Sequence, residues 1–189
     1  MLNTWFVMPT RLPLVVRRCH VCGGERFTAS GKFRVNAHHK VLDAWMLLLC
    51  TRCDDTVKLT VLERVSVRYV GAQLLDGLYE NSPALIGALL LDPAVHNRNR
   101  IALDWEGAWD LEQSGARPQD LVRALRDEQA LEVAVHFGAV IPVRVVNLIA
   151  QGFGLSRGEV KRLVTGGNLV SAVRLGGRIA SDFTFTLKP

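Results

Sequence analysis

Cys19-His20-Val21-Cys22-Gly23-Gly24 and Cys50-Thr51-Arg52-Cys53 are the two stretches that decide the fold of this 189-residue chain. Each stretch holds two thiols on one tight turn, and the glycines after the first pair let backbone N–H groups turn toward the sulfurs. Two such turns complete a tetrahedron around Zn²⁺, which four thiolates at ~2.3 Å satisfy without an open position for water. The sequence therefore predicts one structural zinc ion per chain, with the ligands Cys19, Cys22, Cys50 and Cys53.

A redox dithiol or a disulfide is the competing interpretation of these cysteines. Chains made in the reducing cytoplasm do not normally keep disulfides, and a thioredoxin-type motif would need one Cys-x-x-Cys pair in a βαβ context rather than two pairs. His20 lies inside the first pair and is superfluous as a ligand. His38-His39 are expected to be solvated in a polar turn, the alternative being a second metal site.

The composition indicates a globular protein of the cytoplasm. Hydrophobic residues make up 49% of the chain, which is ample for a buried core. The strongest apolar run, residues 84–91, is far too short to cross a bilayer, and the segment that begins at Met1 lacks an apolar stretch ending in a cleavage site. We therefore expect cytoplasmic localisation and no membrane partner.

The net charge of +5 is unevenly distributed. Residues 1–70 carry 11 Lys/Arg against 5 Asp/Glu, residues 71–130 carry 5 against 10, and residues 131–189 carry 7 against 3. Basic surfaces attract polyanions such as nucleic acid, although the two basic ends can equally pair with the acidic middle. We expect a zinc-ribbon domain at 1–70, an acidic helical or mixed linker region at 71–130, and a basic domain at 131–189.

Apolar periodicity predicts an α+β fold with an antiparallel ribbon at the N-terminus. Strands are expected at residues 5–8, 14–17, 33–37, 41–49 and 57–67. Helices are expected at 71–79 and 84–91, with Ser82 as N-cap before Pro83. Further on, the pattern favours a hairpin at 101–111 that turns at Glu106-Gly107, and a helix at 118–128.

The last third is predicted to alternate strands and helices. A strand is expected at 131–137, a helix from Pro142 through Ala150, and a second helix at 157–164 capped by Ser156. Two final strands, 168–175 and 178–187, are expected to pair through a turn at Gly176-Gly177.

Residues 144–150, 155–164 and 167–170 resemble the small S-four-type RNA-binding domain found in a ribosomal protein, pseudouridine synthases and tyrosyl-tRNA synthetases. The resemblance implies an αα-β unit whose two short helices present basic residues to structured RNA. It places those contacts on Arg144, Arg157, Lys161 and Arg162. The last three occupy positions i, i+4 and i+5 on one side of a helix, which suits phosphates; an ordinary solvated basic face is the alternative.

A longer resemblance rests on five features in order along the chain. They are Trp5, the first cysteine pair, Phe33-Arg34-Val35-Asn36-Ala37, Leu42-Asp43-Ala44-Trp45, and the second cysteine pair. Together they resemble a bacterial family known as domain of unknown function 1062. This resemblance implies a cytoplasmic zinc-containing protein without an established activity. We expect the stretch 33–37 to pack the ribbon rather than to bind a ligand.

Three classes of function remain. The first hypothesis is an RNA-binding or ribosome-associated accessory protein, because a zinc ribbon and an S-four-like unit commonly meet nucleic acid. The second is a protein-interaction module that uses the acidic middle and the pair Trp105 and Trp109. The third is an enzyme, but the chain has no phosphate-binding glycine loop and no His-Glu zinc motif, and nothing pairs Asp43, Glu63, Asp104 and Glu106 for catalysis. We expect no catalytic role and infer no small-molecule substrate.

Overall fold

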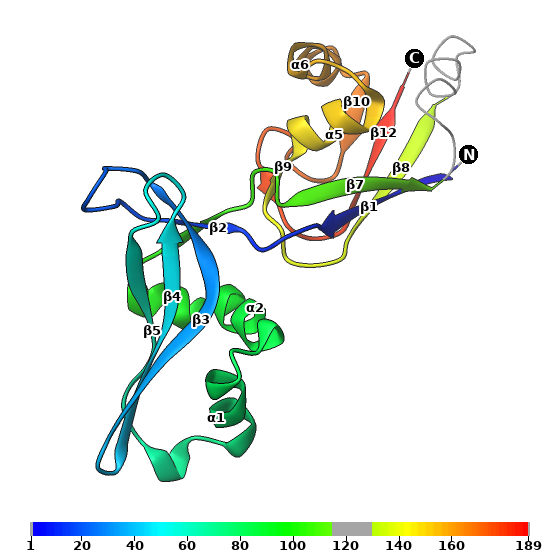
Figure 1. Cartoon of the computed structure of the whole chain (residues 1–189). Coiled ribbons are helices and arrows are strands. Elements are labelled where there is room, and N and C mark those ends of the chain that lie inside the picture. The colour runs from blue at the N-terminus through cyan, green and yellow to red at the C-terminus, as the bar shows by residue number, and fades with distance from the viewer. Residues whose placement is uncertain (1, 115–129, 189) are drawn as a thin grey trace. The chain divides into compact units, whose positions relative to one another are not determined.

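The computed structural model describes residues 2–114 and 130–188, and the predicted helix at 118–128 lies outside these ranges (Figure 1). The chain forms two compact units. The cysteine unit comprises Leu12–Asp104, and the terminal unit combines Met1–Arg11 with Trp105–Pro189. This division differs from the three consecutive segments expected from charge. It arises because strand β1 (Leu2–Pro9) pairs with β7 (Trp109–Ser114) and β8 (Leu131–Phe137), so the start of the chain belongs with its end.

The cysteine unit is built on a five-stranded antiparallel sheet in the order β5-β4-β3-β2-β6. Its strands are β2 (Leu14–Val16), β3 (Arg26–His38), β4 (Val41–Cys50), β5 (Thr56–Ser66) and β6 (Ala102–Asp104). Every second residue of β4, from Leu42 to Cys50, is buried, and those between are half-buried. Since side chains alternate across a strand, β4 has one face in the core and one outside it.

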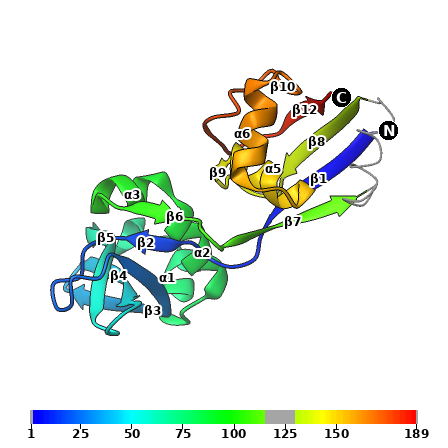
Figure 2. The same ribbon diagram turned by 90° about the horizontal axis from the view of Figure 1, so that it is seen from above.

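Three helices cover the core face of this sheet: α1 (Ala72–Tyr79), α2 (Pro83–Leu91) and α3 (Pro93–Asn99), which follow the 3₁₀ turn η1 (Val67–Tyr69) (Figures 1 and 2). Helix α2 begins as predicted, because the Ser82 hydroxyl accepts a hydrogen bond from the Leu85 N–H and Pro83 occupies the first turn. The apolar residues Leu78, Ile86 and Leu90 of these helices are buried against β4 and its neighbours.

Helix α3 was not predicted from the sequence. Asp92 ends α2 and caps α3, its carboxylate accepting the Ala94 N–H at 2.8 Å. The side chain of Asn99 then bonds the backbone of Thr60 on β5 twice, accepting from its N–H at 2.7 Å and donating to its C=O at 2.8 Å. The Asn99 amide thus supplies hydrogen-bond partners for the Thr60 N–H and C=O at the edge of β5, as a neighbouring strand would.

The terminal unit contains a second five-stranded sheet, in the order β10-β12-β8-β1-β7, with β10 (Leu169–Ser171) and β12 (Phe183–Leu187). Strand β1 runs parallel to β8, and the other pairs are antiparallel. Helices α5 (Val145–Phe153) and α6 (Arg157–Thr165) lie on one face of this sheet (Figure 2). A separate two-stranded ribbon joins β9 (Val143–Arg144) to β11 (Arg178–Ile179).

Trp5 lies at the centre of the terminal core and is 1% exposed. Its ring meets Phe153 of α5 and Phe185 of β12 edge-on, with centroids 5.0 and 5.3 Å apart. Edge-to-face contacts of this kind suit aromatic rings because the positive ring edge meets a negative ring face. The first strand, the α5 helix and the last strand therefore share one core.

One predicted hairpin is wrong, and another is confirmed in part. Within residues 101–111, β6 pairs with β2 in the cysteine unit, whereas β7 pairs with β1 in the terminal unit, because the chain passes from one unit to the other between them. The expected strands 168–175 and 178–187 do pair, through β10 and β12, but the residues that follow Gly176-Gly177 form β11, which pairs with β9 instead. Helix α5 begins at Val145 rather than Pro142, since β9 comes first.

The strands at 5–8, 14–17, 41–49, 57–67 and 131–137 and the helices at 71–79, 84–91 and 157–164 are confirmed to within a few residues. No helix within 2–114 and 130–188 has the length and apolar content needed to cross a membrane.

Candidate metal centre and candidate nucleic-acid surface

The first cysteine turn follows β2. The N–H of Gly23 donates to the Cys19 C=O at 3.1 Å, and the Cys19 N–H donates to the Gly24 C=O at 2.7 Å. Gly23 has φ +72°, which a glycine adopts without strain. The Gly24 N–H also points at the Cys22 sulfur at 3.4 Å. Of the two glycines, Gly24 thus turns its backbone N–H toward sulfur, as the sequence indicated, whereas the Gly23 N–H closes the turn on a carbonyl.

The second cysteine turn repeats this geometry with different residues. The Asp54 N–H donates to the Cys50 C=O at 3.0 Å, and the Cys50 N–H donates to the Asp55 C=O at 2.9 Å. Asp54 takes φ +57°, in the place that Gly23 holds in the first turn. Aspartate tolerates the left-handed region better than most residues. Asp54 and Asp55 are therefore structural counterparts of Gly23 and Gly24, which sequence reasoning missed because it looked for glycine.

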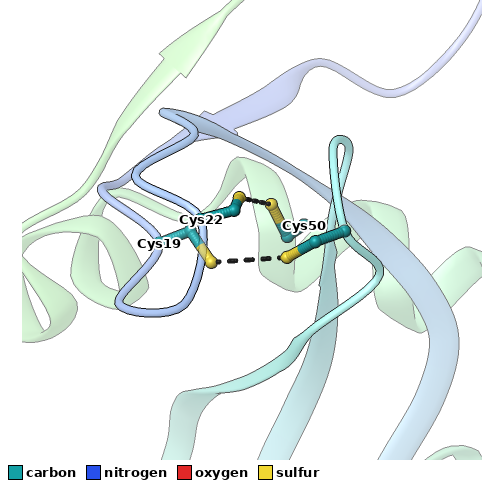
Figure 3. A group of neighbouring side chains, drawn as sticks. Cys19, Cys22 and Cys50 are labelled. Carbon is teal, nitrogen blue, oxygen red and sulfur yellow. Dashed lines mark hydrogen bonds between the residues drawn. The ribbon is translucent and has the colours of Figure 1, made fainter.

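The two turns bring the four sulfurs together (Figure 3). All four lie within 4.8 Å of one another, with 3.7 Å between the sulfurs of Cys19 and Cys53 and 3.6 Å between those of Cys22 and Cys50. A tetrahedron with metal–sulfur bonds of ~2.3 Å has edges of ~3.8 Å. Disulfide sulfurs would be only ~2.05 Å apart. The separations fit one shared metal ion and exclude two cross-links in this state.

The thiols of the cluster differ in acidity. The backbone N–H of Arg52 is the largest influence on Cys50 and lowers its pKa to about 7 against the effect of burial. The backbone N–H of Asp55 lowers the pKa of Cys53, but the neighbouring Cys22 thiol, burial, and the other thiols outweigh it and raise that pKa to about 12. One sulfur thus ionises readily while another resists, as expected when thiolates crowd together without a cation between them. A divalent cation would remove that conflict.

The histidines near the cysteines stand apart from the cluster. His20 is exposed in the first turn, and His38 and His39 are exposed at the β3–β4 turn, with ring centroids 4.4 Å apart. Across the part of the chain that the structure describes, the four cysteines are the one group of three or more metal-ligating side chains. Within the described residues, His38 and His39 therefore have no third metal-ligating side chain close enough to complete a second metal site with them.

Helix α6 presents the basic residues that the sequence singled out. Ser156 and Glu159 form a capping box: the Glu159 N–H donates to the Ser156 hydroxyl at 3.2 Å, and the Ser156 N–H donates to the Glu159 carboxylate at 2.7 Å. Val160 is buried beneath the helix, whereas Arg157, Lys161 and Arg162 are exposed. The three cations therefore lie on the solvent side of α6.

Arg144 lies on β9, immediately before α5, and so comes from a different element than the three cations of α6. Across the ribbon its partner in register is Arg178 on β11. Both arginines are exposed, and neither forms an ion pair with any residue in the described ranges. Sequence reasoning missed Arg178, because it paired the strand after Gly176-Gly177 with the wrong neighbour.

The carboxylates considered as catalytic groups include two that hold the fold together. The Asp43 carboxylate accepts the Arg64 N–H at 2.7 Å, at an irregular point of the β4–β5 pairing. Asp104 pairs with the Arg26 guanidinium at 2.7 Å across the sheet. Trp105, expected to contact a partner in one interpretation, is buried with 7% exposure.

An Asp–His pair in the terminal unit escaped the sequence analysis. Asp182 accepts from His136 Nδ1 at 2.7 Å and from the Phe137 N–H at 2.9 Å, and the His136 side chain is the main cause that lowers the pKa of Asp182. The pair borders a pocket of about 370 Å³. Its contacts tie the start of β12 to the end of β8, one residue beyond their last paired residues, which gives the pair a structural role.

The fold and the cluster define an α+β protein with one four-cysteine centre. Residues 35–175 match the model of a family described as protein of unknown function (DUF1062), which is more than half of the chain. The protein belongs to the DUF1062 family. The matched region includes the second cysteine pair but begins after the first. Neither the curated proteins nor the solved structures contain a match.

Proposed function

We propose that this protein is a zinc-containing RNA-binding protein that acts as an accessory of the ribosome or of another structured RNA. In this proposal the cysteine unit is a zinc ribbon with one structural Zn²⁺, and residues 131–189 contain an S-four-like RNA-binding unit. The acidic middle and any protein partner are secondary to the RNA contact.

Zinc is the metal that the donor set favours. Four thiolates from two tight turns are typical ligands of structural Zn²⁺, and sulfur separations near those of a ~3.8 Å tetrahedral edge need little adjustment. With all four positions taken by sulfur there is no place for a reacting water, so the ion stabilises the fold. Cys19 and Cys50 are buried and would anchor the ion to β2 and β4.

The observation that carries the RNA proposal is the placement of five exposed cations that form no ion pair within 4.0 Å in the described ranges: Arg144, Arg157, Lys161, Arg162 and Arg178. Like charges placed opposite each other on a ribbon destabilise it, so the pair Arg144 and Arg178 is favourable only when an anion lies between or over them. Phosphate groups of RNA supply such anions, and arginine binds them through paired N–H groups.

The helix pair supports the same proposal. Glu159 is the one acidic residue of α6, beside the cations Arg157, Lys161 and Arg162. Its carboxylate already accepts a hydrogen bond from the Ser156 N–H. A capped helix on which three cations stand against one carboxylate keeps a net positive side, which can approach a phosphate backbone without first breaking a close ion pair. The strand order β10-β12 after the two helices agrees with an αα-β unit.

RNA binding measured across a salt series tests the proposal. Wild-type protein should bind structured cellular RNA with an affinity that falls steeply between ~50 and ~200 mM salt, with a slope of about −0.9 per phosphate contact for a duplex. The triple variant Arg157→Ala/Lys161→Ala/Arg162→Ala should flatten that slope, and the double variant Arg174→Ala/Lys188→Ala, which removes two exposed positive charges outside α6, is the comparison. Absence of binding at low salt would refute the proposal.

A pull-down from native lysate with and without nuclease separates RNA from protein partners. If RNA bridges the contact, ribosomal components should be recovered only before nuclease treatment. Recovery that survives nuclease would favour the protein-interaction hypothesis instead.

A further inference from the structure

The outer face of the cysteine-unit sheet, opposite helices α1–α3, carries an apolar row. Trp45, Leu47 and Leu49 occupy alternate positions of β4, and each is half-buried, while the residues between them fill the core. Figure 1 shows α1 and α2 on one side of β3–β5, and their buried residues pack with Ala44, Met46 and Leu48 of the inner face. β4 already supplies its share of the core from its inner face, so this outer row is not needed to pack the helices.

The strand register places a cation on each side of Trp45. Arg34 of β3 lies directly opposite Trp45, and Lys58 of β5 lies opposite Leu47. The Lys58 ammonium is 4.8 Å from the centroid of the Trp45 ring, which is a cation–π distance. Lys58 is exposed, so this ring face of the half-buried Trp45 is covered by a mobile surface side chain rather than by the core.

Two carboxylates of this sheet, on β4 and β6, are engaged elsewhere. Asp43 accepts the Arg64 N–H, and Asp104 pairs with Arg26, each at 2.7 Å. Within the part of the chain that the structure describes, Arg34 and Lys58 have no ion-pair partner. An aromatic ring, two leucines and two uncompensated cations therefore lie together on one sheet face.

We infer that this surface, the Trp45 face (Arg34, Trp45, Leu47, Leu49 and Lys58), is a second RNA contact that binds a single-stranded segment. The inference rests on the proposed RNA-binding function. Sheet faces bind unpaired bases by stacking them on aromatic rings while basic side chains follow the backbone. A duplex keeps its bases stacked inside, so only an unpaired base reaches Trp45. As a base stacks, the Lys58 ammonium moves from the ring to a phosphate.

The test compares an unstructured oligoribonucleotide of about 12 nucleotides with a stable RNA hairpin. Trp45→Leu keeps an apolar side chain but removes the ring, and it should weaken single-strand binding roughly tenfold while hairpin binding changes little. Lys58→Ala should lower the single-strand salt slope by about 0.7. The matched control is Tyr69→Leu, because Tyr69 is also an exposed ring, with the Arg68 guanidinium 4.6 Å from its centroid.

The outcomes separate this inference from the proposed function. If Trp45→Leu and Lys58→Ala bind the oligonucleotide as wild type does while the α6 triple variant loses the hairpin, the Trp45 face is not an RNA surface and the proposed function stands. If wild type binds neither RNA, both fail. Self-association of the wild type that Trp45→Leu abolishes without any change in RNA binding would make the face a protein contact and overturn the inference. Zinc content and unfolding curves show whether each variant is folded. If Trp45→Leu is not folded, Lys58→Ala, which changes only a surface side chain, tests the inference in its place.

Discussion

Gly152 of α5 lies directly against the indole of Trp5. A Cβ atom at Gly152 would fall 2.2 Å from Cη2 of that ring, far inside van der Waals contact. Trp5 cannot move away easily, because Phe153 and Phe185 pack against its ring and it is 1% exposed. The first strand and α5 thus approach as closely as they do only because α5 has no side chain at this position.

Gly152→Ala should therefore destabilise the protein by about 1–3 kcal/mol, the usual cost of overpacking a core. Gly158→Ala is the control, since it lies in the neighbouring helix with only the Ser156 hydroxyl near its Cβ position, at 3.8 Å. That second change should be neutral or stabilise by up to ~1 kcal/mol, because alanine favours helix. Urea unfolding curves of the two variants measure both effects. Equal stability of Gly152→Ala and wild type would contradict the packing described here.

Purified protein should carry one zinc ion per chain, and removing that ion should unfold the cysteine unit. Structural zinc contributes folding free energy directly, because the unfolded chain holds no preformed site. After treatment with a chelator, hydrogen exchange should rise in peptides from β3 and β4 and stay low in peptides from α5. Protection of both regions without metal would contradict a structural role for the ion.

Ligand variants distinguish the cysteines from the nearby histidine. Cys53→Ser should lower zinc content and the stability of the cysteine unit, whereas His20→Ala should retain one zinc, since His20 is exposed and outside the sulfur cluster. Elemental analysis gives the zinc count. Binding of Co²⁺ in place of zinc gives thiolate-to-metal absorption, which reports the sulfur ligands even in a variant of low stability.

Local patterns predicted most elements of the fold. The two cysteine turns, the alternation along β4 and the caps Ser82 and Ser156 each depend on residues close in sequence, so they could be read directly. The grouping of the four cysteines could also be predicted from the sequence, because two Cys-x-x-Cys pairs together supply the four thiolates of one metal site.

Long-range pairing could not be read in the same way. Strand β1, which the sequence placed with the zinc ribbon, pairs with β7 and β8 of the terminal unit, and β11 pairs with β9 rather than with β10. The sequence of a strand does not specify which other strand it pairs with, because every strand offers the same backbone N–H and C=O groups. Arg178 was missed for this reason, since its role comes from Arg144 across the strand pair. The Asp54-Asp55 turn is local and was missed because aspartate takes the left-handed position where glycine was expected.

The capping box of α6 should contribute stability that depends on pH. The Ser156 side chain, then its backbone N–H, and the charge of Arg162 lower the pKa of Glu159 in the folded state against the effect of burial. A lowered carboxyl pKa stabilises the fold above the ordinary pKa of glutamate, and this stabilisation is lost as pH falls through the folded-state value.

Glu159→Gln keeps an oxygen acceptor for the Ser156 N–H but removes the titrating charge. Wild type should be the more stable chain at pH 7, and the difference between the two should close as the pH falls below the ordinary pKa of glutamate, 4.5. Urea midpoints of both chains, measured from pH 7 to pH 3, give this difference, and loss of metal at low pH affects both alike. Glu132→Gln, at an exposed position on β8, controls for loss of a negative charge alone. A difference that stays constant over this range would show that the charge of Glu159 has no part in the cap.

The opposed arginines of the β9–β11 ribbon predict a trade between stability and RNA affinity. Arg178→Glu converts a like-charge pair with Arg144 into an attractive one, so the terminal unit should gain about 0.2–1 kcal/mol at low salt. The gain should shrink as salt screens the pair. The same change should weaken RNA binding, because an anion site has been replaced by a carboxylate.

Arg174→Glu makes the identical charge change at an exposed position outside the ribbon, and it should give no such gain. Thermal unfolding gives the stability of each variant and RNA titration gives its RNA affinity, and both are measured at two salt concentrations. If Arg178→Glu destabilises the protein, Arg144 and Arg178 do not repel each other in the folded state, and the case for a phosphate site between them is lost.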